Sequence, residues 1–368
     1  MLSILAMVFS RRFIDGVYEG SLRGNGERVR LHYIGKGDSL AWLQHLLFDA
    51  PPAEHRKRLR SLLSLRLAGL PAPQTGLQVV EVTPLLERIL KPLGVLSLPD
   101  WVEHVLDLQG EWSTVCRRFR KSTLTRDVPR IERCGFRWDV VNDRQSLEQF
   151  HDLQYAPLMA DRHGEAGVLV SRDWLLSTTE THRLFRLWEG DQWVASALFR
   201  IVDDELDWIL VGMDRQAATP HQRQIQGALY YHMIRYAHAG GFLRIRLGTT
   251  RPLLSDGVWL HKRKWGAAVV RSPQSETRLY LTPRVSSPGF ARWLATHPWV
   301  TLESIQPDVK VCLPDSSMAQ PMLACMRQGL VDGLSSIHLL TPVSDLAIPD
   351  TLEGISVHQV IHEFRELS

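Results

Sequence analysis

The sequence lacks the patterns that mark disulfide-rich and metal-binding proteins. Its four cysteines lie far apart and none forms a CxxC pair, so neither a disulfide framework nor a zinc site is indicated. Its 15 histidines form no HxH or HExxH arrangement, which argues against a metal-dependent hydrolase. We therefore expect reduced, structural thiols and no metal cofactor.

The sequence also lacks a long hydrophobic run near its start. The apolar stretch over residues 1–9 is followed by Arg11 and Arg12. Nine residues are too few to cross a bilayer, and a signal peptide carries its basic residues before the apolar run. These features predict a cytoplasmic protein without membrane insertion.

An excess of charge of one sign is missing as well. The chain has 43 basic and 40 acidic residues, for a net charge of +3. This balance is not typical of a dedicated nucleic-acid binder. Hydrophobic residues make up 44% and charged residues 23%, as in ordinary globular proteins. A chain of 368 residues is long enough for two or three domains.

The N-terminal region, residues 1–99, has the pattern of a mixed α/β unit. Residues 28–34 alternate between apolar and polar side chains, which predicts a half-buried strand. A helix is expected to begin near Ser39, and a second helix is expected over 53–69 between proline-rich and glycine-containing segments. The apolar run over 77–82 predicts another strand.

The central region, residues 100–283, carries the clearest order of elements. Three strand-like runs over 184–213 are joined by short polar connections, which is typical of an antiparallel meander. A helix over 221–241 with a double-glycine end and a strand over 242–248 follow. Upstream, the expected elements are one or two helices over 100–128 with Pro129 as an interruption, a strand over 136–141, and a helix from Asp143 to Gly164.

The last region, residues 284–368, is predicted to be a small α/β module, and we find no catalytic or ligand-binding motif in its sequence. The expected elements are helices over 288–296 and 318–330 and strands over 308–313, 336–341 and 355–361.

Short motifs in the central region follow one another in a recognisable order. They are QWVASALFR, DWILVGMD, GALYYHMIRYAHAGGFLRIRLG and DGVWLHKRKWGA, preceded by YAPLMADRHG. This order resembles the acyltransferase domain of the GNAT superfamily, in its FemAB-like or CelD-like branch, over about half of the chain. The resemblance implies an α+β fold with a GNAT-like, mostly antiparallel sheet flanked by helices. A tandem duplication, with residues 1–99 as a degenerate GNAT half, is a further hypothesis.

The resemblance also implies a binding site for acyl-CoA, such as acetyl-CoA. In the superfamily the donor pyrophosphate sits on backbone amides where the helix after the meander begins. The pattern there is Arg or Gln, two residues, Gly, one residue, then Gly or Ala. Gln224 and Gly227 fit it, Leu229 departs from it, and Ala228 lies beside it. A backbone N–H on the preceding strand, around Leu210 to Gly212, would polarise the thioester carbonyl.

Two groups of residues are candidates for the remaining chemistry. Arg162 could bind an anionic group of the substrate, or serve only as a cation at a helix C-terminus, and His163 is a candidate base. By resemblance, Lys262 would contact a substrate carboxylate or phosphate. Asp256 marks the expected start of the helix that carries this lysine, and Asp214 is a candidate base with Asp207 or a water chain as alternatives.

The sequence therefore predicts an N-acyltransferase that moves an acyl group from acyl-CoA to the amine of a small molecule, sugar or envelope precursor. Two alternatives stay open. An aminoacyl-tRNA donor would give the basic run over 116–126 a purpose, although a solvated helix face also explains that run. An inactive scaffold with a GNAT-like fold would explain the imperfect phosphate pattern. The sequence leaves the acceptor and the oligomeric state open.

Overall fold

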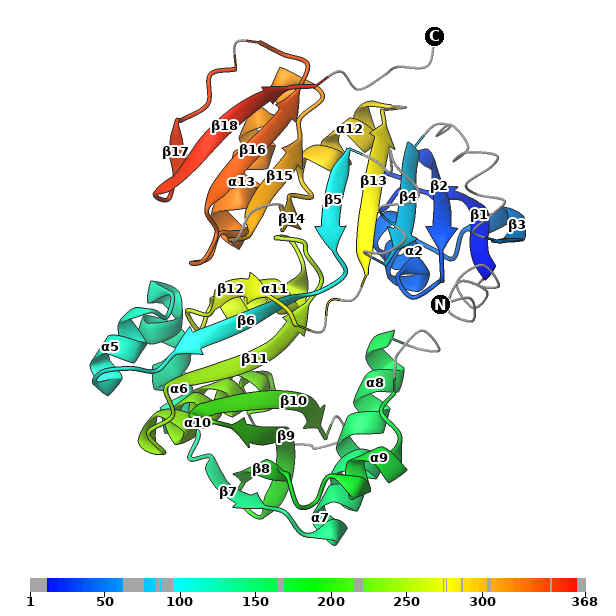
Figure 1. Cartoon of the computed structure of the whole chain (residues 1–368). Helices are drawn as coiled ribbons and strands as arrows, with labels where there is room; N and C mark the ends of the chain where they lie inside the picture. Colours follow the sequence, from blue (N-terminus) through cyan, green and yellow to red (C-terminus); the bar gives the residue numbers. More distant parts are fainter. Residues whose placement is uncertain are drawn as a thin grey trace, which may run out of the picture. The chain divides into compact units, whose positions relative to one another are not determined.

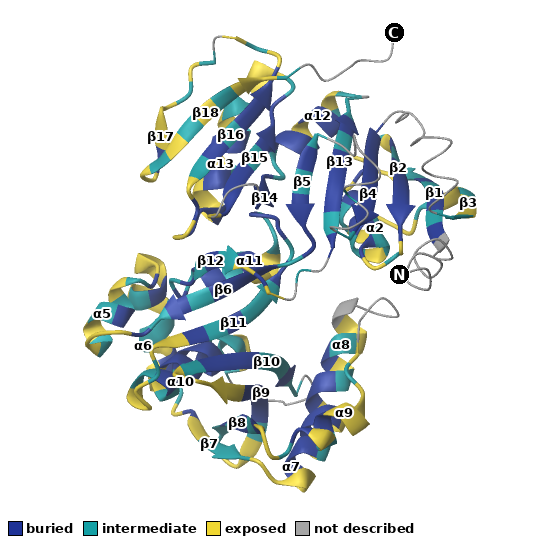
Figure 2. Cartoon of the chain, in the orientation of Figure 1, coloured by how far each residue is buried: buried dark blue, intermediate teal, exposed yellow. Residues whose placement is uncertain are grey.

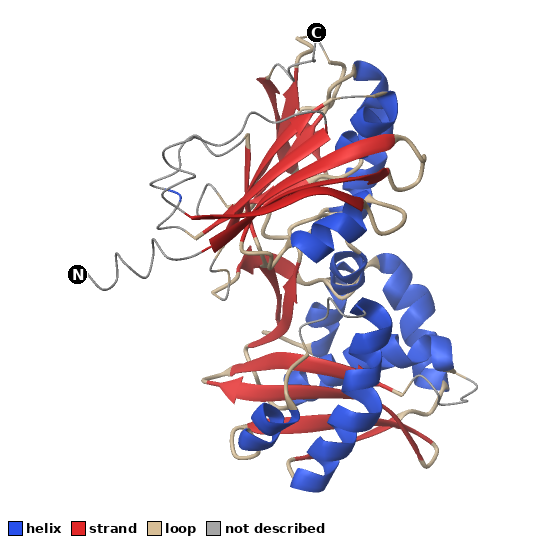
Figure 3. Ribbon diagram, turned by 90° about the vertical axis from the view of Figure 1, so that its right-hand side faces the viewer, coloured by secondary structure: helices blue, strands red, loops and turns tan. Residues whose placement is uncertain are grey.

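The fold, described by a computed structural model, is α+β, as the sequence predicts. The structure describes residues 12–61, 76–83, 87, 95–163, 169–214, 221–273, 275, 277–285, 287–302, 306–344 and 346–362. Three sheets, in which antiparallel neighbours outnumber parallel ones, carry helices on their faces (Figure 1, Figure 3). In this described part of the chain, no helix has the length and apolar composition needed to cross a membrane.

The chain forms two compact units that are not continuous in sequence. The first unit comprises residues 1–102, 250–260 and 270–368, and the second comprises 103–249 and 261–269. The chain therefore passes between the units four times. Whether residues 1–99, 100–283 and 284–368 behave as separate domains stays a prediction.

The first unit contains a six-stranded sheet in the order β3-β1-β2-β4-β13-β5. Its strands are β1 (Arg12–Ser21), β2 (Arg28–Gly35), β3 (Ala53–Ser61), β4 (Gly76–Val82), β5 (Leu96–Pro99) and β13 (Arg278–Arg284). Helices α2 (Leu40–Leu47) and α12 (Pro288–Ala295) contribute to the same hydrophobic core as alternate residues of β2, β4 and β13. The predicted strands over 28–34 and 77–82 and the helix near Ser39 are confirmed.

Helix α2 begins beside a buried carboxylate. Glu81 of β4 accepts a hydrogen bond from the Ser39 hydroxyl at 3.2 Å and another from the Tyr33 hydroxyl. The Tyr33 hydroxyl in turn accepts from the Gly37 N–H at 2.8 Å. Burial raises the pKa of Glu81, and the hydrogen bonds from Tyr33 and Ser39 oppose that rise. The protein thus places its own acidic group where this helix starts.

The first unit also contains a five-stranded sheet in the order β14-β15-β16-β18-β17. Its strands are β14 (Trp299–Thr301), β15 (Asp308–Cys312), β16 (Ser336–Thr341), β17 (Thr351–Leu352) and β18 (Ile355–Ile361), and α13 (Ala319–Gly329) lies between β15 and β16 in the chain. The elements expected in this region are confirmed. Its outer strands β17 and β18 are partly exposed (Figure 2).

The second unit is built on a seven-stranded sheet in the order β12-β6-β11-β10-β9-β8-β7. Its strands are β6 (Val102–Asp107), β7 (Arg137–Val141), β8 (His182–Glu189), β9 (Gln192–Val202), β10 (Glu205–Met213), β11 (Arg244–Thr250) and β12 (Ala268–Arg271). The meander over 184–213, the strand over 136–141 and the strand near 242–248 are confirmed.

Helices cover both faces of this sheet. Its helices are α5 (Trp112–Arg117), α6 (Val128–Arg133), α7 (Arg144–Gln149), α8 (Ala156–His163), α9 (Arg172–Ser177), α10 (Ile225–Ala239) and the end of α11 (Gly257–Arg263). On β9, Ala197 and Phe199 join the core under α10, whereas Leu198 joins the core under α7 and α9. The Asp143 side chain caps α7 by accepting from the Ser146 N–H at 2.8 Å, so the predicted start of that helix is confirmed.

Two predictions about helices are wrong. Residues 53–61 form the edge strand β3, which pairs with β1 and is largely exposed (Figure 2). Strand pairing overrides the helical spacing of this charged segment. The rest of the predicted helix, 62–69, lies outside the described residues. Residues 102–107, expected to be helical, form β6 instead, because a short apolar run satisfies both periods and burial in a sheet decides between them.

Pro129 does not interrupt a helix as expected. It lies at the start of α6, which continues directly from a π-helical turn, Thr123–Asp127, in which the Val128 N–H donates to Thr123 O. The irregularity expected at the proline is thus a wide helical turn just before it, and the helical stretch continues through it.

Candidate functional site

The parallel strands β10 and β11 part early. Their pairing covers three residue pairs, from Glu205 with Arg244 to Asp207 with Arg246. β10 then continues to Met213, where its partners among the described strands are those of β9, and its register shifts at a bulge between Trp208 and Leu210. The edge of β10 that faces β11 therefore loses its ladder partner from Trp208 onward. Bulges of this kind re-aim backbone and side chains at functional sites.

Ion pairs hold the paired end of the two strands. Arg244 contacts Glu205 at 3.1 Å, and Arg246 bridges Glu205 at 3.0 Å and the buried Glu103 of β6. Burial raises the pKa of Glu103, and the Arg246 guanidinium opposes the rise. These ion pairs join β6, β10 and β11 at this end. The strands β10 and β11 therefore stay together up to Asp207 and part after it.

Aromatic rings line the point where the strands part. The Trp208 ring lies 4.6 Å from Tyr230 of α10, and Tyr230 lies 4.6 Å from His261 of α11. Trp265 stacks on Tyr230 at 6.1 Å, and its indole N–H donates to His261 Nε2 at 3.4 Å. Trp208, Tyr230 and Trp265 are buried. All three belong to the hydrophobic core of the second unit, so they pack the place where the strands part.

Lys262 lies beside this aromatic group but binds backbone. The side chain is buried, and Nζ donates to Gly248 O at 2.8 Å and to Thr249 O at 2.9 Å at the end of β11. Gly248 has a φ of 76°, and an added Cβ there would lie 3.3 Å from the Trp208 carbonyl oxygen. The ammonium therefore fixes the backbone where β11 leaves β10. Its predicted contact with a substrate anion stays a prediction.

Helix α10 begins without a side-chain cap. Gln224 is its N-cap residue and makes no capping hydrogen bond, and the first turn holds no acidic residue. A 3-10 turn, Gln222–Gln224, leads directly into α10, and in it the Gln224 N–H donates to His221 O at 2.8 Å and the Ile225 N–H donates to Gln222 O. What this terminus offers an anion is therefore mainly the positive end of the helix dipole. Binding of the donor pyrophosphate by Gln224 and the backbone of this turn stays a prediction.

Gly227 and Ala228 have packing explanations as well. A Cβ added at Gly227 would lie 3.3 Å from Ile131 Cδ1 of α6 and 3.9 Å from the Trp265 ring. Ala228 is fully buried, and so is Leu229, the residue that departs from the superfamily pattern. The small residues here let α10 approach its neighbours, which the sequence pattern alone does not distinguish from phosphate binding.

Gly212 and Asp214 lie at the far end of β10. A Cβ at Gly212 would lie 2.7 Å from the Phe150 ring and 2.8 Å from Gln154 Cβ, so the helical segment after α7 requires glycine here. Asp214 follows the strand, and its N–H donates to Val194 O at 2.9 Å. Gly212 thus belongs to the part of β10 beyond its pairs with β11, and Asp214 follows directly after the strand.

The other predicted residues are not brought together with these by the described contacts. Arg162 and His163 end α8, and their side chains lie outside the description. Asp256 belongs to the first unit and caps α11 by accepting from the N–H groups of Val258 and Trp259, each at 2.9 Å. The catalytic roles of these three residues stay predictions. His261 was not anticipated, although it stands next to Lys262 in the sequence.

Residues 247–266 contain four basic residues, Arg251, Lys262, Arg263 and Lys264, which do not form one surface. Arg251 lies in the first unit between two tryptophans, with its guanidinium 3.9 Å from the Trp101 ring and 4.6 Å from the Trp42 ring. Burial lowers its pKa to about 10, so it stays protonated at neutral pH. Lys262 and Arg263 are buried in the second unit. The cluster is therefore divided between packing roles.

Comparisons with known proteins show similarity at the level of overall structure. FemX is 11% identical, with a TM-score of 0.38, and the match covers 72% of this chain and 84% of that one. L-PGS from Bacillus licheniformis is 12% identical, with a TM-score of 0.34 and coverage of 74% and 85%. The ribosomal-protein-S18-alanine N-acetyltransferase of Escherichia coli is 13% identical, with a TM-score of 0.27 and coverage of 42% and 97%.

At these identities and TM-scores, the similarities assign neither an activity nor a substrate to this chain. No family model matches it, and no curated protein matches it.

Proposed function

We propose that the protein is an N-acyltransferase that uses acyl-CoA as donor. The observation that carries the proposal is the early parting of β10 and β11. The parting leaves a strand edge without ladder partners close to Tyr230 of α10, whose first turn has no side-chain cap. A phosphate-bearing ligand with an acyl group can use both features at once, because helix N-termini favour anions and free strand N–H groups favour a polarised carbonyl.

The donor is placed by three parts of the second unit. Its pyrophosphate lies on the first turn of α10 at Gln224 and the residues after it. Its thioester carbonyl accepts a hydrogen bond from the β10 backbone between Leu210 and Gly212. Its acyl chain contacts the rings of Trp208 and Tyr230, which are buried and apolar.

The reaction is attack of a neutral amine on the thioester carbonyl. The new C–N bond forms, the C–S bond breaks, the amine loses a proton and the leaving thiolate gains one. His261 is the candidate base, with its ring 4.6 Å from that of Tyr230, and Asp214 is the alternative base. Lys262 acts through backbone, since its ammonium holds the carbonyls of Gly248 and Thr249.

We propose the acceptor only by its chemical class: an amine on a small molecule, a sugar or an envelope precursor. The cytoplasmic location predicted from the sequence suits a CoA thioester. An aminoacyl-tRNA donor is the second candidate, because the basic run over 116–126 includes Arg120 and Lys121, both exposed.

The proposal is tested by calorimetric titration of acetyl-CoA into the full chain and into Gln224→Asp. Aspartate is a favourable N-cap residue, so its carboxylate should accept from the N–H groups that the phosphate needs. We expect saturable binding to the natural chain and binding at least tenfold weaker to Gln224→Asp. Gly257→Asp is the matched control, because it adds the same charge at the exposed start of α11 with nothing within 4 Å of the new Cβ.

Release of free CoA thiol is then measured with a panel of amines, and we expect release only when an amine is present. Equal affinity of both variants for acetyl-CoA would contradict the proposed phosphate position. Absence of acetyl-CoA binding would contradict the donor. Binding of aminoacyl-tRNA would then favour the second candidate, and failure of both ligands would leave a non-catalytic scaffold.

A further inference from the structure

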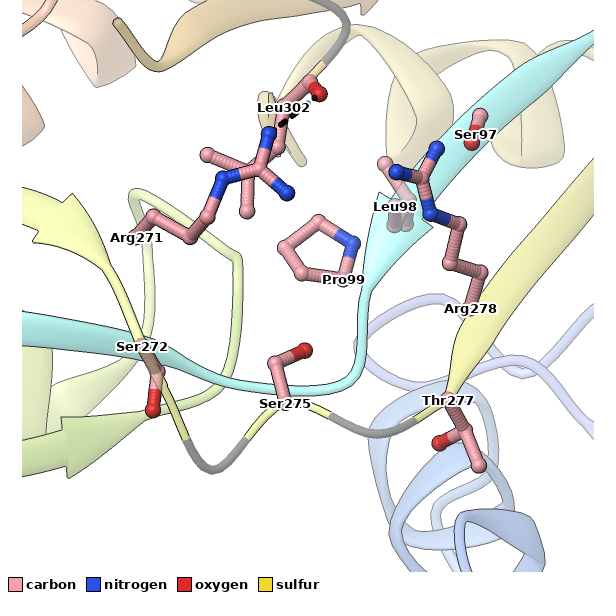
Figure 4. Close-up of a pocket in the computed structure, with 9 residues that line it drawn as sticks. All are labelled: Ser97, Leu98, Pro99, Arg271, Ser272, Ser275, Thr277, Arg278 and Leu302. Atoms are coloured by element: carbon pink, nitrogen blue, oxygen red, sulfur yellow. Dashed lines mark hydrogen bonds between the residues drawn. The ribbon is translucent and has the colours of Figure 1, made fainter. Parts of the chain in front are cut away.

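A small cavity in the first unit is lined by two arginines that face it from different strands. Its volume is about 90 Å³. Arg271 ends β12 and Arg278 begins β13; the guanidinium of Arg271 lies beside Leu302 and that of Arg278 beside Leu98 and Ser97, with Pro99 between the two (Figure 4). The other described lining residues are Ser97, Leu98, Ser272, Ser275, Thr277 and Leu302. No carboxylate occurs among these described lining residues.

Strand register explains the position of one arginine. β13 pairs with β5 in antiparallel fashion, with Arg278 opposite Pro99 and Tyr280 opposite Ser97. Residues opposite one another in such a pair share a face of the sheet. Arg278 is therefore held on the same face as the proline and serine that line the cavity.

The segment between β12 and β13 is anchored before any ligand binds. The Thr277 hydroxyl donates to Asp100 Oδ2 at 2.7 Å, and the Ser275 hydroxyl donates to Asp100 Oδ1. The Trp101 N–H donates to Oδ1 at 3.0 Å, and the Asp100 N–H donates to Thr277 O at 3.2 Å. The Asp100 carboxylate thus accepts three hydrogen bonds, two of them from the segment between β12 and β13, which fixes one wall of the cavity.

The two guanidinium groups keep most of their hydrogen-bonding capacity within the described residues. Arg271 donates to Leu302 O at 3.1 Å, which orients it. Arg278 Nε lies 3.9 Å from Glu87 Oε2, which is beyond hydrogen-bond distance. Each guanidinium carries five N–H donors in a planar fork. Two such forks beside one small cavity are suited to a group with several acceptor oxygens.

We propose that this cavity binds the phosphate group of a small ligand. Arginine forks match phosphate oxygens in pairs, and two cations together favour a doubly charged anion over a carboxylate. The cavity volume equals that of roughly three water molecules in the liquid. This is room for one tetrahedral oxyanion, while the remainder of an organic phosphate would extend toward solvent, where Arg271 is exposed.

This site goes beyond the proposed acyl transfer, since all of its residues belong to the first unit. The test therefore needs no activity. Inorganic phosphate is titrated calorimetrically into the full chain at low ionic strength, and then into Arg271→Gln, Arg278→Gln and the double variant. Arg292→Gln is the matched control, because Arg292 is an exposed residue of α12 in the same unit.

We expect saturable binding with a Kd on the order of 1 mM, a loss of at least fivefold in each single variant, and no detectable binding in the double variant. Arg292→Gln should bind within twofold of the natural chain. Arg278→Lys keeps the charge but not the fork, so it should fall between the natural chain and Arg278→Gln. Circular dichroism of each variant establishes that it is folded.

Two further titrants distinguish the ligand source. Glycerol 3-phosphate that binds more tightly than phosphate indicates a phosphate monoester, and equal or weaker binding indicates the free ion. Absence of saturable phosphate binding, acetate binding as tight as phosphate, or unchanged binding in the folded double variant would each overturn the proposal. Gln224→Asp should leave phosphate binding here unchanged, so failure of the donor site and failure of this site are told apart.

Discussion

The starts of α2 and α10 follow similar strands but differ in whether a carboxylate lies beside them. Each helix follows a strand that pairs in parallel with a later strand: β2 with β4, and β10 with β11. Beside α2, the buried Glu81 carboxylate accepts hydrogen bonds from Ser39 and Tyr33. The first turn of α10 has no acidic residue and no side-chain cap. The first unit has therefore filled its anion position with its own side chain.

The two parallel strand pairs also differ in how far their pairing extends. β2 stays paired with β4 up to Ile34, one residue before its end, whereas β10 continues for six residues after its last pair with β11. Neither helix has a side-chain cap or an acidic residue in its first turn, so the two starts differ in the Glu81 carboxylate that β4 brings beside α2. The start with this carboxylate goes with strands that stay paired, and the start of α10 goes with strands that part. This contrast is the reason for proposing ligand binding in the second unit. The hypothesis that residues 1–99 are a degenerate copy stays a prediction.

Removing the Glu81 carboxylate of the first unit should have the largest effect on stability. Glu81→Ala leaves the Tyr33 and Ser39 hydroxyls without their acceptor in a buried place, and we expect a loss of about 3 kcal/mol in the free energy of unfolding. Urea unfolding followed by circular dichroism measures it. Glu54→Ala, on the exposed edge strand β3, should change the free energy by less than about 0.5 kcal/mol. Equal losses would show that Glu81 does not hold this unit together.

Removing the Lys262 ammonium, which holds the end of β11, should destabilise the second unit. Lys262→Met removes two hydrogen bonds to the carbonyls of Gly248 and Thr249 and keeps the side-chain length, and we expect a loss of about 2 kcal/mol. Lys264→Met is the control, since Lys264 is only half-buried. The same urea assay applies, and a smaller effect at Lys262 than at Lys264 would contradict its role as a backbone anchor.

Acid should act on both units through buried histidines. Burial lowers the pKa of His297 in the first unit and of His232 in the second to about 4. Both pKa values lie below the unfolded value near 6.5, so this contribution to stability is complete above pH 6.5 and is lost as pH falls toward 4.

His297→Gln should therefore lose about 1–2 kcal/mol less than the natural chain between pH 7 and pH 4.5. Urea unfolding at several pH values measures this difference. The exposed His45→Gln should follow the natural chain. A pH profile of His297→Gln that matches the natural one would contradict the assignment.

The smallest effect, and of opposite sign, is expected from giving α10 the acidic group that it lacks. Gln224→Asp should raise the free energy of unfolding by about 0.5–1 kcal/mol through capping. The same variant should bind acetyl-CoA less well. Thermal unfolding without ligand measures the gain. A loss of stability together with weaker binding would mean that the substitution damages the fold and does not occupy the anion position.

Much of the fold follows from sequence periodicity, because most strands and helices bury one face. The meander, α10 and the C-terminal elements could be predicted for this reason. β3 and β6 could not, since β3 is an exposed edge strand rich in charge and β6 is buried even at Glu103 and His104. Neither shows the alternation of a half-buried strand.

The candidate site was less predictable than the fold. The start of α10 is encoded locally, but the parting of β10 and β11 depends on which residues pair across about 40 positions of sequence, and no local pattern reports a missing pair. Lys262 looked like an exposed cation because its two carbonyl partners are backbone atoms. His261 carried a signal only through its position in the same turn as Lys262 and Trp265.

The position of β13 in the sheet of the first unit imposes a delay on biosynthesis. β13 lies between β4 and β5 and pairs with both, yet it follows β5 by about 180 residues. At synthesis rates of roughly 5–20 residues per second, β4 and β5 emerge from the ribosome some 10–35 s before their shared neighbour. During that interval their facing edges have no strand between them, so this sheet can be completed only after the second unit has been synthesised.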